Sequence, residues 1–334
     1  MENEKQYIIK TADQLDNSPV EWLIPDWIPK RGITLLFGDG GTGKSYLWVS
    51  LASALSKGNR NVLCSEPSTE TKVLCLSGED AECVLRKRFE SANGNLKNIY
   101  AIGQDSEVPN ITFSGEVLEE IIDDVKPGLL IFDPLQSFIG SNVDMSRRNQ
   151  MRQAMKPLQA LSSKHNMPIV VICHSNKREK AENGRDKLAD SADLWDIARS
   201  VIMCGIGDNN ERYISLEKSS YADHLHVPTV LFNIEAGRLV PNGTVSMKMR
   251  DFVRERKTNN ENKVTTKKSE CEDAILSLLS SDAWKNANQL KIALKDKGYG
   301  DKTIKTALQS LKAQGFIEMH RLNGGIVEYK QTED

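Results

Sequence analysis

The chain has 334 residues, 39% of them hydrophobic and 27% charged, and its formal net charge is −2. This composition is ordinary for a soluble protein with a sizeable core, and it excludes a polycation that would bind nucleic acid through bulk charge. The length exceeds what one core usually supports, so we expect one large domain and one small domain. No run approaches the about 18 apolar residues of a membrane span, and the first residues contain no apolar signal region. We therefore expect a cytoplasmic protein without membrane contact.

The first 248 residues alternate short apolar runs with longer amphipathic stretches. Residues 1–31 are a lead-in that we expect to pack on the main domain. Buried strands are predicted at 33–37, 73–77, 99–103, 129–133 and 169–173, and helices at 44–55, 81–92, 116–125 and 147–164. Apolar strands separated by helices indicate a parallel sheet covered on both faces. Further runs at 200–204, 213–217 and 229–234 lack long helices between them, which predicts antiparallel additions at the sheet edge. Residues 32–248 are thus expected to form one α/β domain.

The remaining residues form a different kind of unit. Residues 249–269 are polar and charged without periodicity, so we expect a linker there. Residues 270–334 have three helical stretches, then two short apolar runs around Asn323-Gly324-Gly325, which is a hairpin signal. From residue 247 to 334 there are 17 Lys and Arg against 13 Asp and Glu. This positive balance on an otherwise acidic chain hints at nucleic-acid contact.

A glycine-rich segment follows the first predicted strand and opens the first predicted helix. It fits the pattern G-x-x-x-x-G-K-[ST], whose backbone N–H groups and helix N-terminus bind phosphates. Its residues, with the tyrosine that follows, are Gly38, Asp39, Gly40, Gly41, Thr42, Gly43, Lys44, Ser45 and Tyr46. In this pattern the lysine reaches the β- and γ-phosphates and the Ser45 hydroxyl binds Mg²⁺. The sequence therefore predicts a site for ATP and Mg²⁺ and an ATPase activity.

Polar side chains follow three other predicted strands, at the sheet edge where open α/β sheets bind their ligands. Asp133 ends its strand and is expected to hold the Mg²⁺ shell, because Mg²⁺ prefers oxygen ligands. Glu79 is the candidate for activating water, although it and its neighbour could instead be first-turn acids of the next helix. His174 is the candidate for sensing the γ-phosphate, although a lone histidine is more often a local structural donor.

These elements together resemble the RecA-like ATPases of the RepA type, the hexameric replicative helicases of plasmids and phages. The resemblance covers about residues 20–240 and follows the family order. Its segments are 22–25 (Trp-Leu-Ile-Pro), 38–45, 76–80 (Leu-Ser-Gly-Glu-Asp), 85–88, 130–135, 171–177, 191–199 and 218–221. The resemblance implies that Glu79 is the catalytic glutamate, His174 the sensor and Arg199 an arginine finger. A finger reaches the γ-phosphate of the neighbouring subunit, which implies a homo-oligomeric ring, expected to be a hexamer.

Basic residues suggest where DNA could bind. Two loops follow catalytic strands, and rings of this kind line their central channel with such loops, where basic side chains suit the phosphates of single-stranded DNA. The loop candidates are Arg147, Arg148, Lys177, Arg178, Lys180, Arg185 and Lys187. The last unit resembles a winged helix-turn-helix, whose third helix carries Lys302 and Lys305 and could enter a duplex groove or dock a replication protein. These features predict a DNA helicase or translocase that replicates a plasmid, phage or mobile element. An ATP-switched initiator or regulator and a recombinase-like DNA-binding ATPase remain alternatives.

Overall fold

The computed structural model describes residues 9–108, 111–145, 147–175, 192–279, 283–322 and 324–332, without the side chains of residues 192 and 255–265. The chain divides into two compact units, Met1–Val253 and Arg254–Asp334. Among the described helices, none has both the length and the apolar character that crossing a membrane requires.

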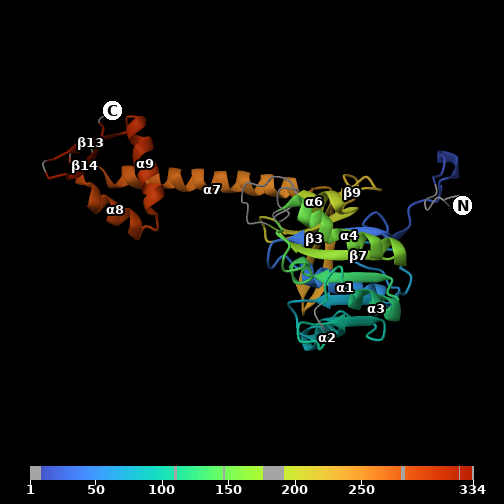
Figure 1. The fold of residues 1–334 in the computed structure, drawn as a ribbon. Helices are drawn as coiled ribbons and strands as arrows, with labels where there is room; N and C mark the ends of the chain where they lie inside the picture. The colour runs from blue at the N-terminus through green and yellow to red at the C-terminus, as the bar shows by residue number, and fades with distance from the viewer. Residues whose placement is uncertain are drawn as a thin grey trace, which may run out of the picture. The chain divides into compact units, whose positions relative to one another are not determined.

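The first unit is built on one large mixed sheet (Figure 1). Its strands, in spatial order, are β11 (Arg238–Val245), β10 (Thr229–Glu235), β9 (Arg212–Ser219), β8 (Ser200–Ile206), β3 (Gly32–Gly38), β7 (Pro168–His174), β6 (Leu129–Asp133), β4 (Val73–Ser77) and β5 (Ile99–Ile102). Pairing is parallel from β8 through β5 and antiparallel from β8 through β11. The predicted α/β class, with a mainly parallel sheet and antiparallel edge strands, is confirmed.

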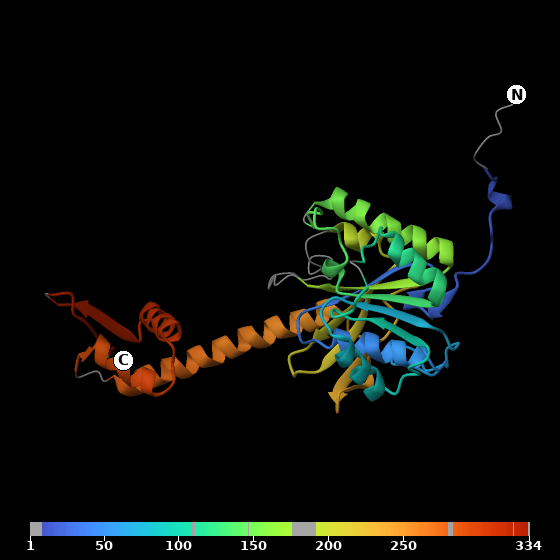
Figure 2. The ribbon, with the colours of Figure 1, turned by 60° about the horizontal axis from the view of Figure 1, so that its bottom comes forward.

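Helices cover both faces of this sheet (Figure 2). Successive residues of a strand point to opposite faces, so Leu35 and Leu36 of β3 belong to two different clusters. The Leu35 side contains α3 (Glu116–Val125), α4 (Arg148–His165) and α6 (Ala192–Ile197). The Leu36 side contains α1 (Lys44–Leu55), α2 (Glu82–Ser91), β1 (Trp22–Ile24) and β2 (Ile28–Pro29). Ile24, Trp27 and Ile28 of the lead-in belong to this second cluster. Two short 3-10 turns, η1 (Ala12–Gln14) and η2 (Leu135–Ser137), complete the unit.

Two strands of the large sheet differ from the sequence prediction. The run at 200–204 was expected to be an antiparallel addition, but β8 pairs parallel with β3, with Ser200 opposite Thr34. β7 ends at His174 and β8 begins at Ser200, and a connection of this length is enough for a parallel return. The edge strand β11 was missed because its exposed polar residues give no apolar pattern.

The second unit contains a small helical cluster and a three-stranded antiparallel sheet. Its elements are the end of α7 (Met249–Leu278), β12 (Lys285–Asn286), α8 (Ala287–Asp296), α9 (Asp301–Ala313), β13 (Ile317–Arg321) and β14 (Val327–Gln331). Cys271, Ile275, Leu290, Ile304 and Leu311 are among the residues that fill its core. The hairpin β13–β14 pairs Arg321 with Val327, and Gly324 and Gly325 lie between them. The assignment of this unit as a winged helix-turn-helix stays a prediction.

Helix α7 begins in the first unit, where Met249 and Phe252 are buried, and ends in the second. Residues 249–269, which the sequence analysis assigned to a linker, lie within this helix. Its middle has no apolar stripe, so hydrophobic periodicity did not indicate a helix there. Arg, Lys and Glu are nevertheless good helix formers. The pair Lys268 and Glu272, with 3.2 Å between charged atoms, adds an i,i+4 contact.

Candidate functional site

The glycine-rich loop joins the end of β3 to the start of α1, as the sequence predicted. Gly43 caps α1 with a φ of 106°, and a Cβ at this position would lie 3.1 Å from the Phe232 ring. Glycine is required there because L side chains rarely adopt this φ. At Gly40 and Gly41 an added Cβ would meet no described atom within 4 Å, so the loop is open on that side. The loop thus presents free space at a helix N-terminus.

Lys44 folds back over this loop. Its side chain is buried, and Nζ donates to the carbonyl oxygens of Gly38 at 2.8 Å and Asp39 at 2.9 Å. Burial lowers the pKa of Lys44. The neighbouring thiols Cys173 and Cys204 stay neutral, because burial raises the pKa of each to about 12. An ammonium ion held among carbonyls is costly to bury, and an anion beside it would offset that cost. The loop therefore fits a phosphate group.

Asp133 ends β6 and is 5% exposed. Its Oδ2 accepts a hydrogen bond of 2.6 Å from Trp48 Nε1 of α1. Burial raises the pKa of Asp133, while the Trp48 hydrogen bond opposes this rise. A divalent cation would also favour the ionised carboxylate. Ser45, in the first turn of α1, supplies a half-buried hydroxyl. A hydroxyl and a carboxylate are oxygen donors of the kind that Mg²⁺ prefers, so the two residues fit this ion.

Glu79 and His174 lie together at the same edge of the sheet. Glu79 follows β4 and His174 ends β7, with 3.5 Å between Glu79 Oε1 and His174 Nε2. Both side chains are about half exposed, at 59% and 43%, so water can reach them. Asp80, the other acid of this segment, forms an ion pair with Arg88 of α2. The carboxylate beside the histidine is therefore Glu79.

Strand pairing places these residues in one row. His174 pairs with Gly38, and Asp133 pairs with Ser77, two residues before Glu79. The loop after β7 also contacts the phosphate loop, because Ser175 N donates to the Gly38 carbonyl at 3.2 Å. The carboxyl ends of parallel strands thus bring the predicted phosphate, metal, water-activating and sensor residues to one edge.

Arg199 lies at the opposite end of the parallel strands, where they begin. Its backbone N donates to the carbonyl of Ile33 at the start of β3. A Cβ on Gly32 would lie 2.7 Å from Arg199 Cγ, so the arginine stem passes directly over Gly32. The phosphate loop begins at Gly38, at the other end of the same strand. At about 3.3 Å per residue, the two ends of β3 are about 20 Å apart. Arg199 therefore cannot reach the phosphate loop of its own chain.

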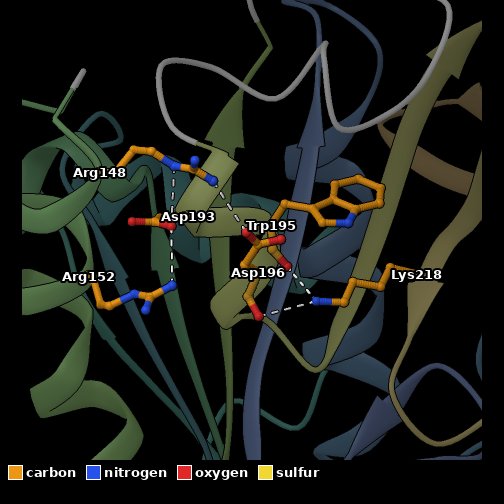
Figure 3. Close-up of polar contacts among 6 residues, drawn as sticks. All are labelled: Arg148, Arg152, Asp193, Trp195, Asp196 and Lys218. Carbon is orange, nitrogen blue, oxygen red and sulfur yellow. Dashed lines mark hydrogen bonds and ion pairs between the residues drawn. The ribbon is translucent and has the colours of Figure 1, made fainter.

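The candidates for DNA binding have different surroundings. Arg147 pairs with Asp144, with 3.2 Å between Nε and Oδ2. Arg148 lies 3.5 Å from both Asp193 and Asp196 of α6 (Figure 3). On α9, Lys302 and Lys305 are exposed. The remaining loop candidates lie outside the described residues; these are Lys177, Arg178, Lys180, Arg185 and Lys187.

Sequence reasoning missed several residues with structural roles here. Trp48 reads as an apolar helix residue, and nothing in the sequence indicates that its indole N–H bonds Asp133. Arg152 adds a second cation to Asp193, at 3.3 Å. Lys218, on β9, donates to carbonyls at the end of α6. Segments 191–199 and 218–221 were singled out by family resemblance, but that resemblance did not indicate that they contact each other.

Comparisons with known proteins identify a family for part of the chain. Residues 8–180 match the family described as AAA domain. The DNA repair protein RadA of Listeria monocytogenes is 26% identical over 147 residues, which is 43% of this chain and 28% of that protein. RadA of Campylobacter jejuni is 22% identical over 172 residues, 50% of this chain and 34% of that protein. The chain thus matches about a third of the length of these relatives.

A solved structure gives the fold. The ATPase domain of G40P superimposes with a TM-score of 0.50 at 15% identity, over 64% of this chain and 86% of that one. It shares the parallel-core sheet with helices on both faces, which is the RecA-like P-loop fold that the sequence predicted. The family match covers more than half of the chain, so the protein belongs to the AAA domain family and is a P-loop ATPase of RecA-like fold.

Proposed function

We propose that this protein is an ATP-driven DNA translocase or helicase of the RepA type, active as a ring, that serves the replication of a plasmid, phage or mobile element. The observation that carries the proposal is the position of Arg199. One edge of the sheet holds the phosphate loop, Asp133, Glu79 and His174, while Arg199 lies at the other end of β3, about 20 Å away. Both positions are explained if Arg199 of one subunit completes the phosphate site of the neighbouring subunit.

Within one subunit the residues have separate tasks. The N–H groups of the loop and Lys44 bind the phosphates of ATP, and Ser45 and Asp133 would hold Mg²⁺, which would supply positive charge beside the phosphates. Glu79 orients a water molecule and accepts its proton. His174, 3.5 Å from Glu79, connects this carboxylate to the loop that begins at Ser175. Arg199 of one subunit stabilises charge in the site of the next.

DNA is the expected partner of the segment that follows His174. The segment after His174 contains Lys177, Arg178, Lys180, Arg185 and Lys187. Cations on a loop suit backbone phosphates without reading sequence, which fits a translocase. Lys302 and Lys305 are exposed on α9, where they would contact duplex DNA if the second unit is a winged helix.

Two other candidates have observations of their own. The RadA relatives are DNA repair proteins by name, which favours a recombinase-like DNA-binding ATPase. The separate second unit, with exposed lysines on α9, favours an ATP-switched initiator or regulator. Both share the subunit chemistry of the helicase and differ in what hydrolysis does to DNA.

ATP hydrolysis and strand separation distinguish these candidates. We expect single-stranded DNA to stimulate hydrolysis, and a forked duplex to be unwound only while ATP is hydrolysed. The Lys44→Ala protein is the control and should do neither. If no unwinding is detected and Lys302→Ala/Lys305→Ala abolishes a sequence-specific mobility shift that Lys312→Ala retains, the regulator is supported. Strand exchange or branch movement without unwinding of a fork would support the recombinase.

A further inference from the structure

The short helix α6 immediately precedes Arg199 and is held by cations from two other elements (Figure 3). Near its start, Asp193 is 5% exposed and accepts from Arg152 Nη2 at 3.3 Å, with Arg148 Nε at 3.5 Å. Both arginines belong to α4. A buried carboxylate between two guanidinium groups is a strong anchor, so the first turn of α6 is fixed to α4.

The other end of α6 is held by Lys218 of β9. Its Nζ donates to the carbonyl oxygens of Trp195 at 2.6 Å, Ala198 at 2.8 Å and Asp196 at 3.3 Å. The last carbonyls of a helix lack partners within the helix, and a cation there is favoured by the helix dipole. An ammonium group has three N–H donors, and these three contacts match them.

One of these contacts acts directly on Arg199. The Ala198 carbonyl and the Arg199 N–H belong to the same peptide unit. Lys218 holds the carbonyl side of that unit, and Ile33 O accepts from its N–H at 2.8 Å. The next peptide unit is held by Ser220 N, which donates to the Arg199 carbonyl at 2.8 Å. Lys218 and Ser220, at the end of β9, therefore hydrogen-bond the backbone on both sides of Arg199.

We propose that Lys218 is a positioning residue that sets the backbone of Arg199, so that its guanidinium group is presented to the neighbouring subunit. This inference rests on the proposed role of Arg199 in a shared site. Loss of the Lys218 contacts removes the hydrogen bond on the carbonyl side of the Ala198–Arg199 peptide, so its orientation is less restricted and the guanidinium group samples more positions. Hydrolysis in the neighbouring site then falls, while nucleotide binding in the subunit that carries the change is unaffected.

Lys218→Met removes the ammonium group and keeps most of the stem. The chain offers a matched control in Lys72, whose Nζ donates at 3.1 Å to the carbonyl of Val125, the last residue of α3. Lys72→Met also removes a lysine from a helix end, but at a place far from Arg199 in the sheet order. Comparing the two variants separates a general loss of stability from an effect on Arg199.

The test mixes full-length variants and measures hydrolysis. Arg199→Ala keeps an intact phosphate loop and lacks the finger, whereas Lys44→Ala lacks a working loop and keeps the finger, so mixing them should restore activity. Two double variants, Lys44→Ala/Lys218→Met and Lys44→Ala/Lys72→Met, are each mixed with Arg199→Ala. We expect the activity restored by the first to be lower than that restored by the second by a factor of about ten or more. In the reverse direction, Lys218→Met should be rescued by Lys44→Ala, and its KM for ATP should match the wild type while its kcat is lower.

The outcomes test the role of Lys218 separately from the shared site on which it rests. Equal restoration by the Lys218→Met and Lys72→Met donors, while Lys44→Ala itself restores activity, overturns the role of Lys218 and leaves the shared site standing. No restoration by Lys44→Ala overturns the shared site and this inference with it. Lys218→Arg keeps a cation and should recover part of the donor activity. If Lys218→Met does not fold, Lys218→Gln, which removes the charge but keeps a polar group, takes its place, and a Lys218→Gln donor equal to Lys72→Met contradicts the inference.

Discussion

The hydrogen bond from Trp48 to Asp133 provides a sharp test of how the metal-binding carboxylate is tuned. Trp48→Phe keeps an aromatic ring in the core and removes the indole N–H that donates to Asp133 Oδ2 at 2.6 Å. Asp133 is 5% exposed, so water cannot easily replace this donor. Hydrogen bonds to charged groups contribute about 1.5–3 kcal/mol. Without this donor the ionised carboxylate loses its stabilising partner, so the pKa of Asp133 should rise further.

The change should also affect stability in a pH-dependent way. Burial already raises the pKa of Asp133 in the folded state, so ionising it costs folding free energy as pH rises above the unfolded value. Trp48→Phe enlarges this cost. The destabilisation caused by Trp48→Phe is therefore largest above the folded-state pKa of Asp133. It decreases as the pH falls toward 3.8, the ordinary pKa of an aspartate.

Urea denaturation of four proteins measures the effect: wild type, Trp48→Phe, Asp133→Asn and the double variant. At pH 8 we expect Trp48→Phe to cost about 1.5–3 kcal/mol in the wild-type background and much less in the Asp133→Asn background. The cost should shrink as the pH is lowered from 8 toward 3.8. The acid limb of the pH–rate profile for hydrolysis should move to higher pH. An equal cost in both backgrounds, or a cost that stays the same over this whole pH range, would refute the reasoning.

Three further predictions concern residues at the ends of the parallel strands. Lys44→Ala should abolish hydrolysis and weaken nucleotide binding measured by titration, because it removes the cation over the phosphate loop; full activity would contradict the site. Glu79→Gln should keep ATP binding and lower kcat about 10²–10⁴-fold; an unchanged single-turnover rate would exclude it as the water-activating group. Gly32→Ala should cost about 1–3 kcal/mol in denaturation, because Gly32 has a φ of 110° and its new Cβ would lie 2.7 Å from Arg199 Cγ. Part of that cost should disappear when Arg199 is also changed to Ala, and an identical cost in both backgrounds would show that the arginine stem is not involved.

The sequence predicted most of the row at the carboxyl edge because each residue follows an apolar strand. Parallel pairing alone then places Gly38, His174 and Asp133 together, without any knowledge of side-chain contacts. The contact between Trp48 and Asp133 could not be predicted, because it depends on how α1 packs over β6. An indole in an apolar helix face carries no sign of its partner.

The position of Arg199 also needed the structure. The sequence places it before a strand, but which edge it occupies depends on that strand being parallel to β3, and β8 was expected to be antiparallel. The antiparallel pairing of β8 with β9 then brings Lys218 to the end of α6. Likewise, residues 249–269 are helical although they have no apolar periodicity and contain several Asn and Thr residues, which are weak helix formers, and this is why a linker was expected.

The central claim is that one subunit supplies the phosphate loop and the next supplies Arg199. Its most direct test is the hydrolysis rate of Arg199→Ala and Lys44→Ala proteins mixed over a range of mole fractions with single-stranded DNA. A shared site predicts little activity for either protein alone and a maximum at intermediate fractions. Mixtures that never exceed the two separate proteins would contradict the claim.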